Sequence, residues 1–361
     1  MKRLDGIKVI EIGTVVLGPY VGQILADLGA EVIKVEALWG DVTRDLGTGK
    51  TAGMSALFLG CNRGKKSIAL DLKKAEGRAV LDRLVEGADI LVHNMRADTA
   101  AQLGLYYERL AAINSRLIFC GTYGFGASGR YAKMPAYDDI IQAFGGIAAL
   151  NQKVGGPPRY APTILADKGT ALFSVIGILS ALFERSRTGK GCEMEVPMFE
   201  TMAHFLSIEH LGARTYDPSE EEYGYARLLN VHRKPYETKD GFLAVMPYSE
   251  QNWLMFFEAV DRGDILEDPR FATAQKRAEN ISALYEEMAS AMRMRTTAEW
   301  LDYLNARDIP CAPIQSLDDM LGDPHLAEVG FWHRYEHPSE GTLVAPSLPV
   351  RLGSIQRASS M

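Results

Sequence analysis

The chain has 361 residues, of which 47% are hydrophobic and 24% charged, and its net charge is −7 at pH 7. This length favours two domains over one, because a single domain usually holds roughly 100 to 200 residues. The acidic balance argues against nucleic acid or an anionic membrane as the main partner. The four cysteines lie far apart and form no CxxC or metal-ligand pattern, so we expect reduced thiols in a cytoplasmic protein.

The first third of the chain alternates short β-branched runs with amphipathic stretches. IKVIEI (7–12) predicts a strand, residues 20–28 a helix that ends at Gly29, and EVIKVE (31–36) a second strand. A β-α-β order implies parallel strands with a right-handed crossover. Further expected elements are strands at 67–72, 88–94 and 116–124, a helix at 75–86 and a helix that ends near Leu110. This alternation predicts an open α/β sheet that binds ligands at the carboxyl ends of its strands.

Residues after Gly124 predict mainly helices. The expected elements are a helix at 137–150, a long helix that begins near Asp167, a strand at 193–198 and a helix that ends near Gly212. The acidic stretch from Arg214 to Glu222 is typical of a connection into a second domain. That domain should contain a strand at 241–247, helices at 251–260, 281–292 and 297–305, and the loop IPCAPI. The apolar run from Gly169 to Phe183 is shorter than the roughly 20 residues of a membrane span and predicts a buried helix.

Common cofactor and metal motifs do not match. The first βα turn, GTVVLGP, has two glycines at the wrong spacing for dinucleotide binding, and SRTGKGC lacks the pattern of a phosphate-binding loop. The seven histidines form no zinc-ligand pair, and no GxSxG nucleophile motif occurs. We therefore expect no metal and no tightly bound cofactor.

Asp167 stands out because it lies between an apolar run and the start of an apolar helix. On the residues alone, the more common interpretation is a helix N-cap, which Asp fills well. The same position suits a nucleophile, since backbone N–H groups and the helix dipole would keep a carboxylate ionised there. Both interpretations stay open on this evidence.

Several cations lie in the first part of the chain: Arg44, Arg63, Lys65, Lys66, Lys73 and Arg96. Some of them follow predicted strands, so they could meet at one edge of the sheet and bind a polyanionic ligand. Solvated surface charge is the equally open alternative for each of them.

A series of ordered motifs over nearly the whole chain resembles the class III coenzyme A transferases. These motifs are LDGIKVIEIG, GPYVGQILADLGAEVIKVE, GDVTR, NRGKKSIALDLK, GFGASGRYAKMPAYDDIIQAFGG, LADKGTALFSVIGILSALFERSRTGKG and IPCAPI. The family includes formyl-CoA transferase, the carnitine and bile-acid CoA transferases and the related α-methylacyl-CoA racemases. The resemblance implies a Rossmann-like large domain (1–205 plus 325–361), a smaller α+β domain (206–324) and a homodimer of interlocked chains.

The resemblance also implies the chemistry. Asp167 matches the aspartate that attacks an acyl-CoA thioester, forming first a mixed anhydride and then an aspartyl-CoA thioester. CoA and acyl-CoA are then substrates, and a small carboxylic acid is the acceptor. Relatives often carry Arg where this chain has Ala37. The family's CoA contacts map onto Val16, Leu70, Asp71, Leu72, Lys73, Asn94, Met95, Arg96, Ala136 and Tyr137.

Position 137 favours transfer over racemisation. Similar racemases have His followed by Asp there, because they need a second acid/base on the other face of the α-carbon. This chain has Tyr137, and a phenol with its ordinary pKa near 10 is a poor base at neutral pH. An α-methylacyl-CoA racemase or isomerase, and a CoA-binding relative without turnover, remain the alternatives.

The acceptor acid is less well defined by the resemblance. The stretch YGYARLLNVHRKPYETKDG lacks the consecutive glycines of formyl-CoA transferases, which argues against oxalate or formate. Arg227, His232 and Arg233 in this stretch either meet an acceptor carboxylate or form a solvated basic loop. Relatives usually continue into an LGEHT-like motif, which does not occur in the last residues, RLGSIQRASSM.

Overall fold

A computed structural model of the protein describes residues 3–217 and 223–353, and the chain divides into two compact units. Unit 1 comprises Met1–Ala148, Tyr160–Leu206 and Glu328–Met361. Unit 2 comprises Ala149–Arg159 and Ser207–Ala327. Part of the expected acidic connection, residues 218–222, lies outside the described residues.

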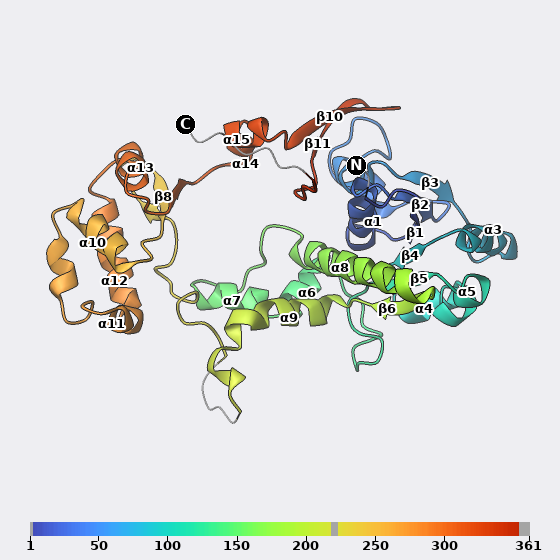
Figure 1. The fold of residues 1–361 in the computed structure, drawn as a ribbon, viewed down its shortest axis with the longest axis horizontal. Coiled ribbons are helices and arrows are strands. Elements are labelled where there is room, and N and C mark those ends of the chain that lie inside the picture. The colour runs from blue at the N-terminus through green and yellow to red at the C-terminus, as the bar shows by residue number, and fades with distance from the viewer. Residues whose placement is uncertain (1–2, 218–222, 354–361) are drawn as a thin grey trace. The chain divides into compact units, whose positions relative to one another are not determined.

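Unit 1 is built on one sheet of six parallel strands in the order β3-β2-β1-β4-β5-β6 (Figure 1). The strands are β1 (Lys8–Ile12), β2 (Glu31–Glu36), β3 (Lys66–Ala69), β4 (Ile90–His93), β5 (Ile118–Gly121) and β6 (Cys192–Glu195). The predicted open α/β sheet is thus confirmed. The strand order reverses between β1 and β4, and such sheets bind their ligands at the carboxyl ends of the strands beside this point.

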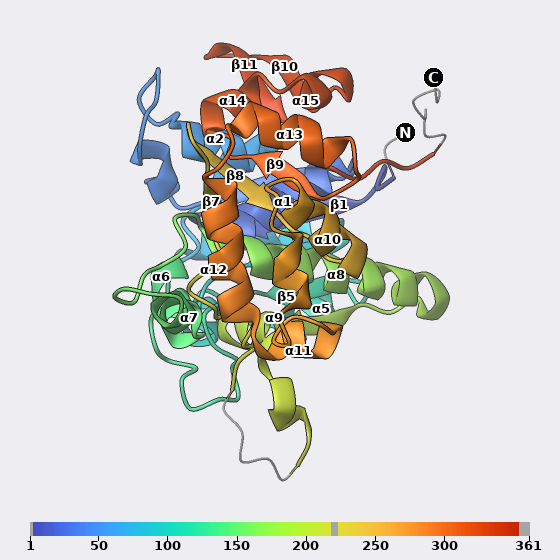
Figure 2. The ribbon, with the colours of Figure 1, turned by 90° about the vertical axis from the view of Figure 1, so that its left-hand side faces the viewer.

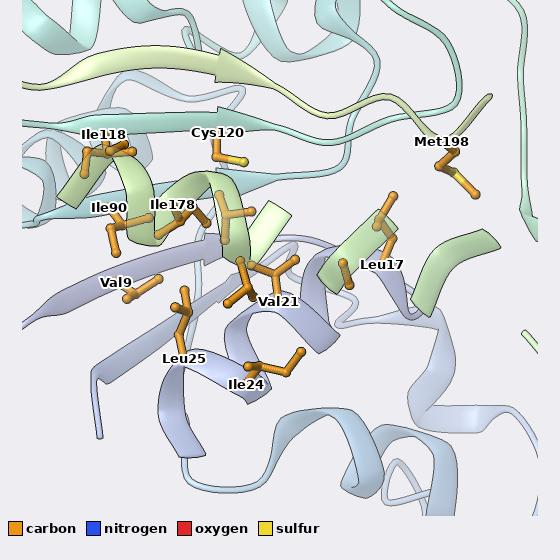
Figure 3. Close-up of a cluster of buried hydrophobic side chains, with 14 of the residues drawn as sticks. Val9, Leu17, Val21, Ile24, Leu25, Ile90, Ile118, Cys120, Ile178 and Met198 are labelled. Carbon is orange, nitrogen blue, oxygen red and sulfur yellow. The ribbon is translucent and has the colours of Figure 1, made fainter. Parts of the chain in front are cut away.

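Helices cover both faces of the sheet, so successive strand residues enter different cores. Ile90 and Val92 of β4 pack in the core formed with α1 (Leu17–Asp27) and α8 (Leu165–Thr188), which Figure 3 shows in close-up. Leu91 packs in the other core, formed with α3 (Ala75–Glu86), α4 (Ala97–Gln102) and α5 (Tyr107–Ile113). Burial on both faces explains why the central strands β4 and β5 are nearly continuous hydrophobic runs.

Helix α8 is longer than the apolar run that predicts it. Its 24 residues are long and apolar enough, by length and composition alone, to cross a membrane. Its buried side chains, which include Ala171, Val175 and Ile178, nevertheless belong to the core beside α1. The expectation of a core helix therefore accounts for its hydrophobicity, whereas the expectation that it is too short for a span was wrong.

Two other predicted elements of unit 1 differ from the observed ones. The helix expected over 137–150 is two helices, α6 (Asp138–Phe144) and α7 (Ile147–Lys153). Gly145 and Gly146 separate them, and Gly146 has a φ of +94°, which ends a helix and favours glycine. The hairpin of β10 (Trp332–His337) and β11 (Gly341–Pro346) was not predicted. Further helices are η1 (Val42–Asp45), α2 (Ala56–Asn62) and α9 (Met198–His210).

Unit 2 has a small antiparallel sheet of β7 (Tyr236–Glu237), β8 (Phe242–Val245) and β9 (Cys311–Pro313). The predicted loop IPCAPI therefore contributes a strand. The helices are α10 (Glu250–Glu258), α11 (Ala274–Glu279), α12 (Ile281–Met292), α13 (Thr297–Asn305), α14 (Leu317–Leu321) and, at its end, α15 (Pro324–Glu328) (Figure 2). Trp253, Phe256 and Trp300 fill a separate core between these elements. Unit 2 thus has its own hydrophobic core.

Candidate active site

Asp167 lies in the first turn of α8, on the carboxyl side of the sheet. Later in the helix, Ser174 Oγ is 3.4 Å from Oγ1 of Thr122, the residue that follows β5. Near the other end of α8, Arg185 donates to the carbonyl oxygens of Asp89 and Arg116, which precede β4 and β5. The helix therefore runs opposite to the strands. Asp167 precedes Ser174 by two turns, about 10 Å of helix, and so extends beyond the carboxyl ends of the strands.

A different aspartate caps this helix. Asp138, the first residue of α6, accepts hydrogen bonds from the backbone N–H groups of Ala166 (2.7 Å) and Asp167 (3.0 Å) through Oδ1. Gln142 donates to the other carboxylate oxygen of Asp138 at 2.6 Å. The N-cap residue itself is Ile164, which has no capping side chain. The interpretation of Asp167 as an N-cap was therefore wrong, because Asp167 is the third helical residue.

The carboxylate of Asp167 is buried, with 6% of the residue exposed, and it has no hydrogen-bond partner within the described part of the chain. Burial, and next the negative charge of Asp138, raise the pKa of Asp167 to about 7. The expectation that the helix start keeps this group firmly ionised was wrong, since the nearest N–H groups donate to Asp138 instead. A carboxylate with a raised pKa is more basic than usual and is a candidate for chemistry near neutral pH.

A pocket of about 510 Å³ lies at the carboxyl ends of β1, β2 and β3. Five predicted CoA-contact residues line it: Leu70, Asp71, Leu72, Lys73 and Met95. Its wall also includes Ala37 and the exposed pair Leu38 and Trp39, of which Trp39 is 74% exposed. An indole with a free face, a methionine and a nearby lysine suit a ligand that combines a flat ring with phosphate groups. Sequence reasoning missed Trp39, although a tryptophan three residues after a predicted strand was an available signal.

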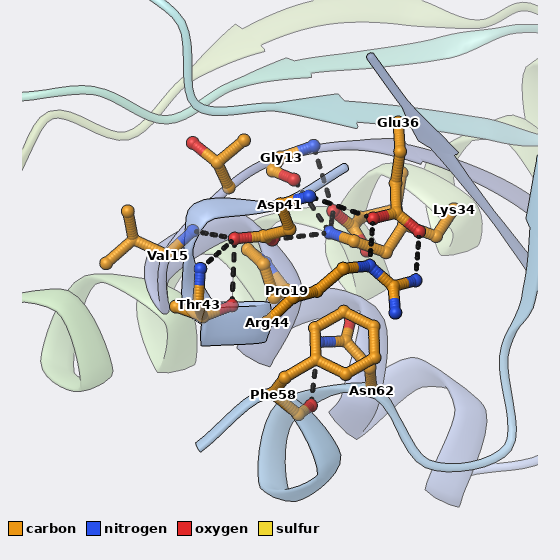
Figure 4. A network of polar contacts seen from close by, with 12 residues as sticks. Gly13, Val15, Pro19, Lys34, Glu36, Asp41, Thr43, Arg44, Phe58 and Asn62 are labelled. Atoms are coloured by element: carbon orange, nitrogen blue, oxygen red, sulfur yellow. Dashed lines mark hydrogen bonds and ion pairs between the residues drawn. The ribbon is translucent and has the colours of Figure 1, made fainter. Parts of the chain in front are cut away.

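A buried network of charges holds the turn beside this pocket (Figure 4). Lys34 Nζ lies 3.2 Å from a carboxylate oxygen of Glu11 and 3.0 Å from one of Asp41, and it donates to the carbonyl of Gly13 at 2.8 Å. Asp41 accepts from the N–H of Val15, which has a φ of +68°. A β-branched residue in this left-handed region is strained, so the network fixes a turn that would otherwise relax.

The charges in this network shift one another's pKa values. Burial raises the pKa of Asp41, but the charge of Lys34 and hydrogen bonds from Thr43 outweigh burial and leave it below its usual value. Burial lowers the pKa of Lys34, and its two carboxylate neighbours more than reverse this effect. Lys34 and Asp41 therefore form a charged pair within a buried network that acts as a structural unit.

The profile of the family described as CoA-transferase family III matches residues 4–360. The chain belongs to this family. It is 31% identical to the succinate–glutarate CoA-transferase of Agrobacterium fabrum over 358 residues, covering 96% of this chain and 88% of that protein. It is 32% identical to the acetyl-CoA:oxalate CoA-transferase of Acetobacter aceti over 350 residues, which cover 96% of this chain and 88% of that protein. A solved CAIB/BAIF family protein from Brucella suis has 33% identity and a TM-score of 0.81, covering 97% of this chain and 92% of that chain.

In this CoA-transferase, the other predicted CoA contacts do not line the 510 Å³ pocket. Val16 is buried just before α1. Asn94 accepts from the N–H of Thr14 (3.0 Å) and donates to its carbonyl (2.7 Å), so it supports the turn next to the pocket. Arg96 donates to the carbonyl of Lys133 at 2.8 Å. These residues surround the pocket region without forming its wall.

Ala136 and Tyr137 precede α6, on the same segment as Asp138. A Cβ added at Gly124 would lie 2.5 Å from that of Ala136, so these two chain segments approach each other closely. Tyr137 is 69% exposed, and its phenol hydroxyl has no hydrogen bond among residues 3–217 and 223–353, although its backbone carbonyl accepts from the N–H of Ile141 at 3.1 Å. The structure therefore defines the backbone position of Tyr137 beside Asp138, whereas no hydrogen bond fixes its phenol within the described residues.

Four of the six predicted cations of the CoA-transferase are already paired. Arg44 pairs with Glu36 (2.7 Å), Lys65 with Glu11 (2.9 Å) and Lys66 with Glu31 (2.6 Å), and Arg63 pairs with Asp27. Of the six, only Lys73 lines the pocket. The expectation that several of these cations converge on one rim was wrong, because four of the six neutralise carboxylates within the fold. In the described ranges, no group of three His, Cys, Asp or Glu side chains could hold a metal ion.

Proposed function

We propose that this family III CoA-transferase moves CoA from an acyl-CoA donor to a small carboxylic acid, with Asp167 as nucleophile. The observation that carries the proposal is the buried, unpartnered carboxylate of Asp167, whose pKa is raised to about 7. Such a group is ionised in a large fraction of molecules at neutral pH and is poorly solvated, which favours attack on a thioester carbonyl.

The reaction consists of four balanced steps. The Asp167 carboxylate attacks the donor's thioester carbonyl, the C–S bond breaks, and a mixed anhydride and CoA thiolate form. The thiolate then attacks the Asp167 carbonyl, releasing the donor's carboxylate and leaving an aspartyl-CoA thioester. The acceptor carboxylate attacks this thioester, which gives a second anhydride and frees the thiolate again. Attack of the thiolate on the acceptor's acyl carbonyl yields the new acyl-CoA and restores Asp167.

We assign CoA to the 510 Å³ pocket of unit 1 and its surroundings. The ammonium of Lys73 has no partner among the described residues and can pair with a phosphate, and Trp39 and Met95 offer apolar faces to the adenine. The remaining contacts implied by the family resemblance form the route toward Asp167. They are Val16, Leu70, Asp71, Leu72, Asn94, Arg96, Ala136 and Tyr137.

We further propose that the protein is a cytoplasmic homodimer, with unit 1 as the large domain and unit 2 as the small domain. The support is a stripe of exposed side chains on α8, Leu172, Ile176, Leu179 and Phe183, which are 37% to 67% exposed. Their spacing places them on one side of the helix. Exposing a contiguous apolar stripe to water is unfavourable, and a second copy in the interlocked arrangement implied by the family would cover it.

The decisive test is to trap the enzyme-bound intermediates. The protein is incubated with succinyl-CoA, then with hydroxylamine or borohydride, and digested for mass spectrometry. We expect the adduct on Asp167, none in Asp167→Asn, and the wild-type amount in Asp139→Asn, which changes an exposed carboxylate two residues from Tyr137. If CoA transfer proceeds while Asp167 stays unmodified, the covalent mechanism is wrong.

A further inference from the structure

Unit 2 contains a pocket of about 440 Å³ beside its three-stranded sheet. All three strands contribute to it, with Tyr236 from β7, Ala244 and Val245 from β8, and Cys311 and Ala312 from β9. Val245 and Cys311 are register partners, as are Ala244 and Ala312, so the sheet itself forms the floor. A pocket of this size on a regular sheet is suited to a small-molecule ligand.

Three cations line this pocket: Arg227, Arg233 and Lys234. No Asp or Glu is among its lining residues in the described part of the protein. Arg233 and Lys234 make no side-chain hydrogen bond or ion pair with any residue that the structure describes. A pocket with three positive charges and no internal carboxylate is electrostatically incomplete and attracts an anion.

Arg227 is held in position by two aromatic rings. Its Nε donates to the hydroxyl of Tyr285 at 3.4 Å, and its guanidinium carbon lies 5.7 Å from the centre of the Tyr248 ring. Restricting a long side chain in advance lowers the entropy that ligand binding must remove. His232, in contrast, pairs with Glu286 at 3.0 Å and does not line the pocket. Two of the three residues considered for the acceptor therefore share one pocket, and the third does not.

The remaining wall is apolar and includes Pro235, Met246, Pro247 and Pro310. Methylene groups pack well on such a surface, whereas bare inorganic anions gain nothing from it. The arginine forks match carboxylates in a two-point geometry. The charge favours a dianion, because one carboxylate would leave two cations without a partner.

We propose that this pocket binds a short-chain dicarboxylate. The binding does not depend on the proposed function. One carboxylate pairs with Arg227 and the other with Arg233 and Lys234, and the methylene chain lies on the prolines and Met246.

Direct binding tests the site without turnover. Glutarate is titrated calorimetrically into full-length Asp167→Asn protein and into the same protein carrying Arg233→Gln or Arg227→Gln. We expect each substitution to weaken glutarate binding at least tenfold. Arg293→Gln removes an exposed arginine of unit 2 that lies outside the pocket and should leave binding unchanged. Equal affinity in all these proteins, or no glutarate binding at all, overturns the proposal.

Two further measurements separate the possible failures. If adenosine 3′,5′-bisphosphate displaces glutarate, the pocket is a phosphate site and the dicarboxylate assignment is wrong. The Asp167 adduct forms from succinyl-CoA before any acceptor binds, so its absence sinks the proposed function while arginine-dependent glutarate binding would still stand.

Discussion

The carboxylate of Asp138 accepts a hydrogen bond from the backbone N–H of Asp167 at 3.0 Å, so Asp138 caps the helix that carries Asp167. This contact has two effects on Asp167. It removes the N–H groups that would have stabilised its charge, and it places a second negative charge nearby. Together with burial, these effects raise the pKa of Asp167 to about 7. The same hydrogen bonds thus order the helix start and increase the basicity of the proposed nucleophile.

Asp167→Asn should abolish CoA transfer and stabilise the fold at alkaline pH. Without a nucleophile the rate should fall on the order of 10³-fold or more. The pKa of Asp167 rises from 3.8 to about 7 on folding, so wild-type stability is lost as pH increases through that interval. At pH 8 the full free-energy cost of ionising the buried Asp167 is present. Asp167→Asn should therefore raise the free energy of unfolding by up to about 4 kcal/mol. Urea unfolding at pH 5 and pH 8 measures this, and an equal difference at both pH values would contradict the raised pKa.

Asp138→Asn should shift the pH dependence of transfer. An amide oxygen can still cap α8, but the negative charge beside Asp167 is gone. The pKa of Asp167 should then fall, and the acidic limb of the kcat/KM profile should move to lower pH by about one unit. The amide also faces the donor of Gln142, so some loss of stability is expected. The control is Asp139→Asn in the same helix, and identical shifts in both variants would show that Asp138 has no specific effect.

Local patterns predicted most of the fold. The central strands β4 and β5 of unit 1 are hydrophobic runs between turn residues, and α12 and α13 begin and end where the sequence predicts. A capping box between Thr296 and Glu299 marks the start of α13. The β10–β11 hairpin escaped prediction because β10, with the sequence WHRYEH, is not a hydrophobic run. The end of α6 before Gly145 and Gly146 was not predicted, because apolar residues continue on both sides of the two glycines.

The candidate site was only partly predictable. Asp167 could be singled out by its unusual position, but its environment depends on Asp138, which is 29 residues away and follows no capping motif. The pairing of Lys65 with Glu11 joins residues 54 positions apart, so a lysine that looked free in a basic run has a buried side chain. Contacts between distant segments determine which charges are available, and no local pattern contains that information.

Removing Lys73 or Trp39 should weaken CoA binding in different ways. Lys73→Ala should reduce affinity more for CoA than for its dephosphorylated form, because the lysine pairs with a phosphate. Trp39→Ala should reduce affinity for both and remove CoA-dependent quenching of tryptophan fluorescence. Lys74→Ala removes the neighbouring charge, which does not line the pocket, and is the matched control. Calorimetric titration with CoA measures these affinities. If Lys74→Ala weakens CoA binding as much as Lys73→Ala does, only the net charge of the segment affects binding.

Lys34→Met should destabilise unit 1 strongly. The substitution leaves the buried carboxylates of Glu11 and Asp41 without their shared cation, at a cost of about 3 to 5 kcal/mol. Lys66→Met breaks an exposed ion pair with Glu31 and should cost far less stability, because solvent screens that pair. Denaturant unfolding of both variants compares them directly. Similar losses in the two proteins would show that the buried network does not hold the turn at Val15.

The exposed stripe on α8 predicts where a second copy binds. Replacing Ile176 or Phe183 with glutamate puts a charge on the stripe without changing the buried side of the helix. If this stripe is an interface between copies, the charge must be desolvated there, and sedimentation should show a smaller species than the wild-type dimer. Glu184→Gln, in the same helix, is the control and should sediment as the wild type does. A monomeric wild type, or glutamate variants that still form the wild-type species, would exclude this interface.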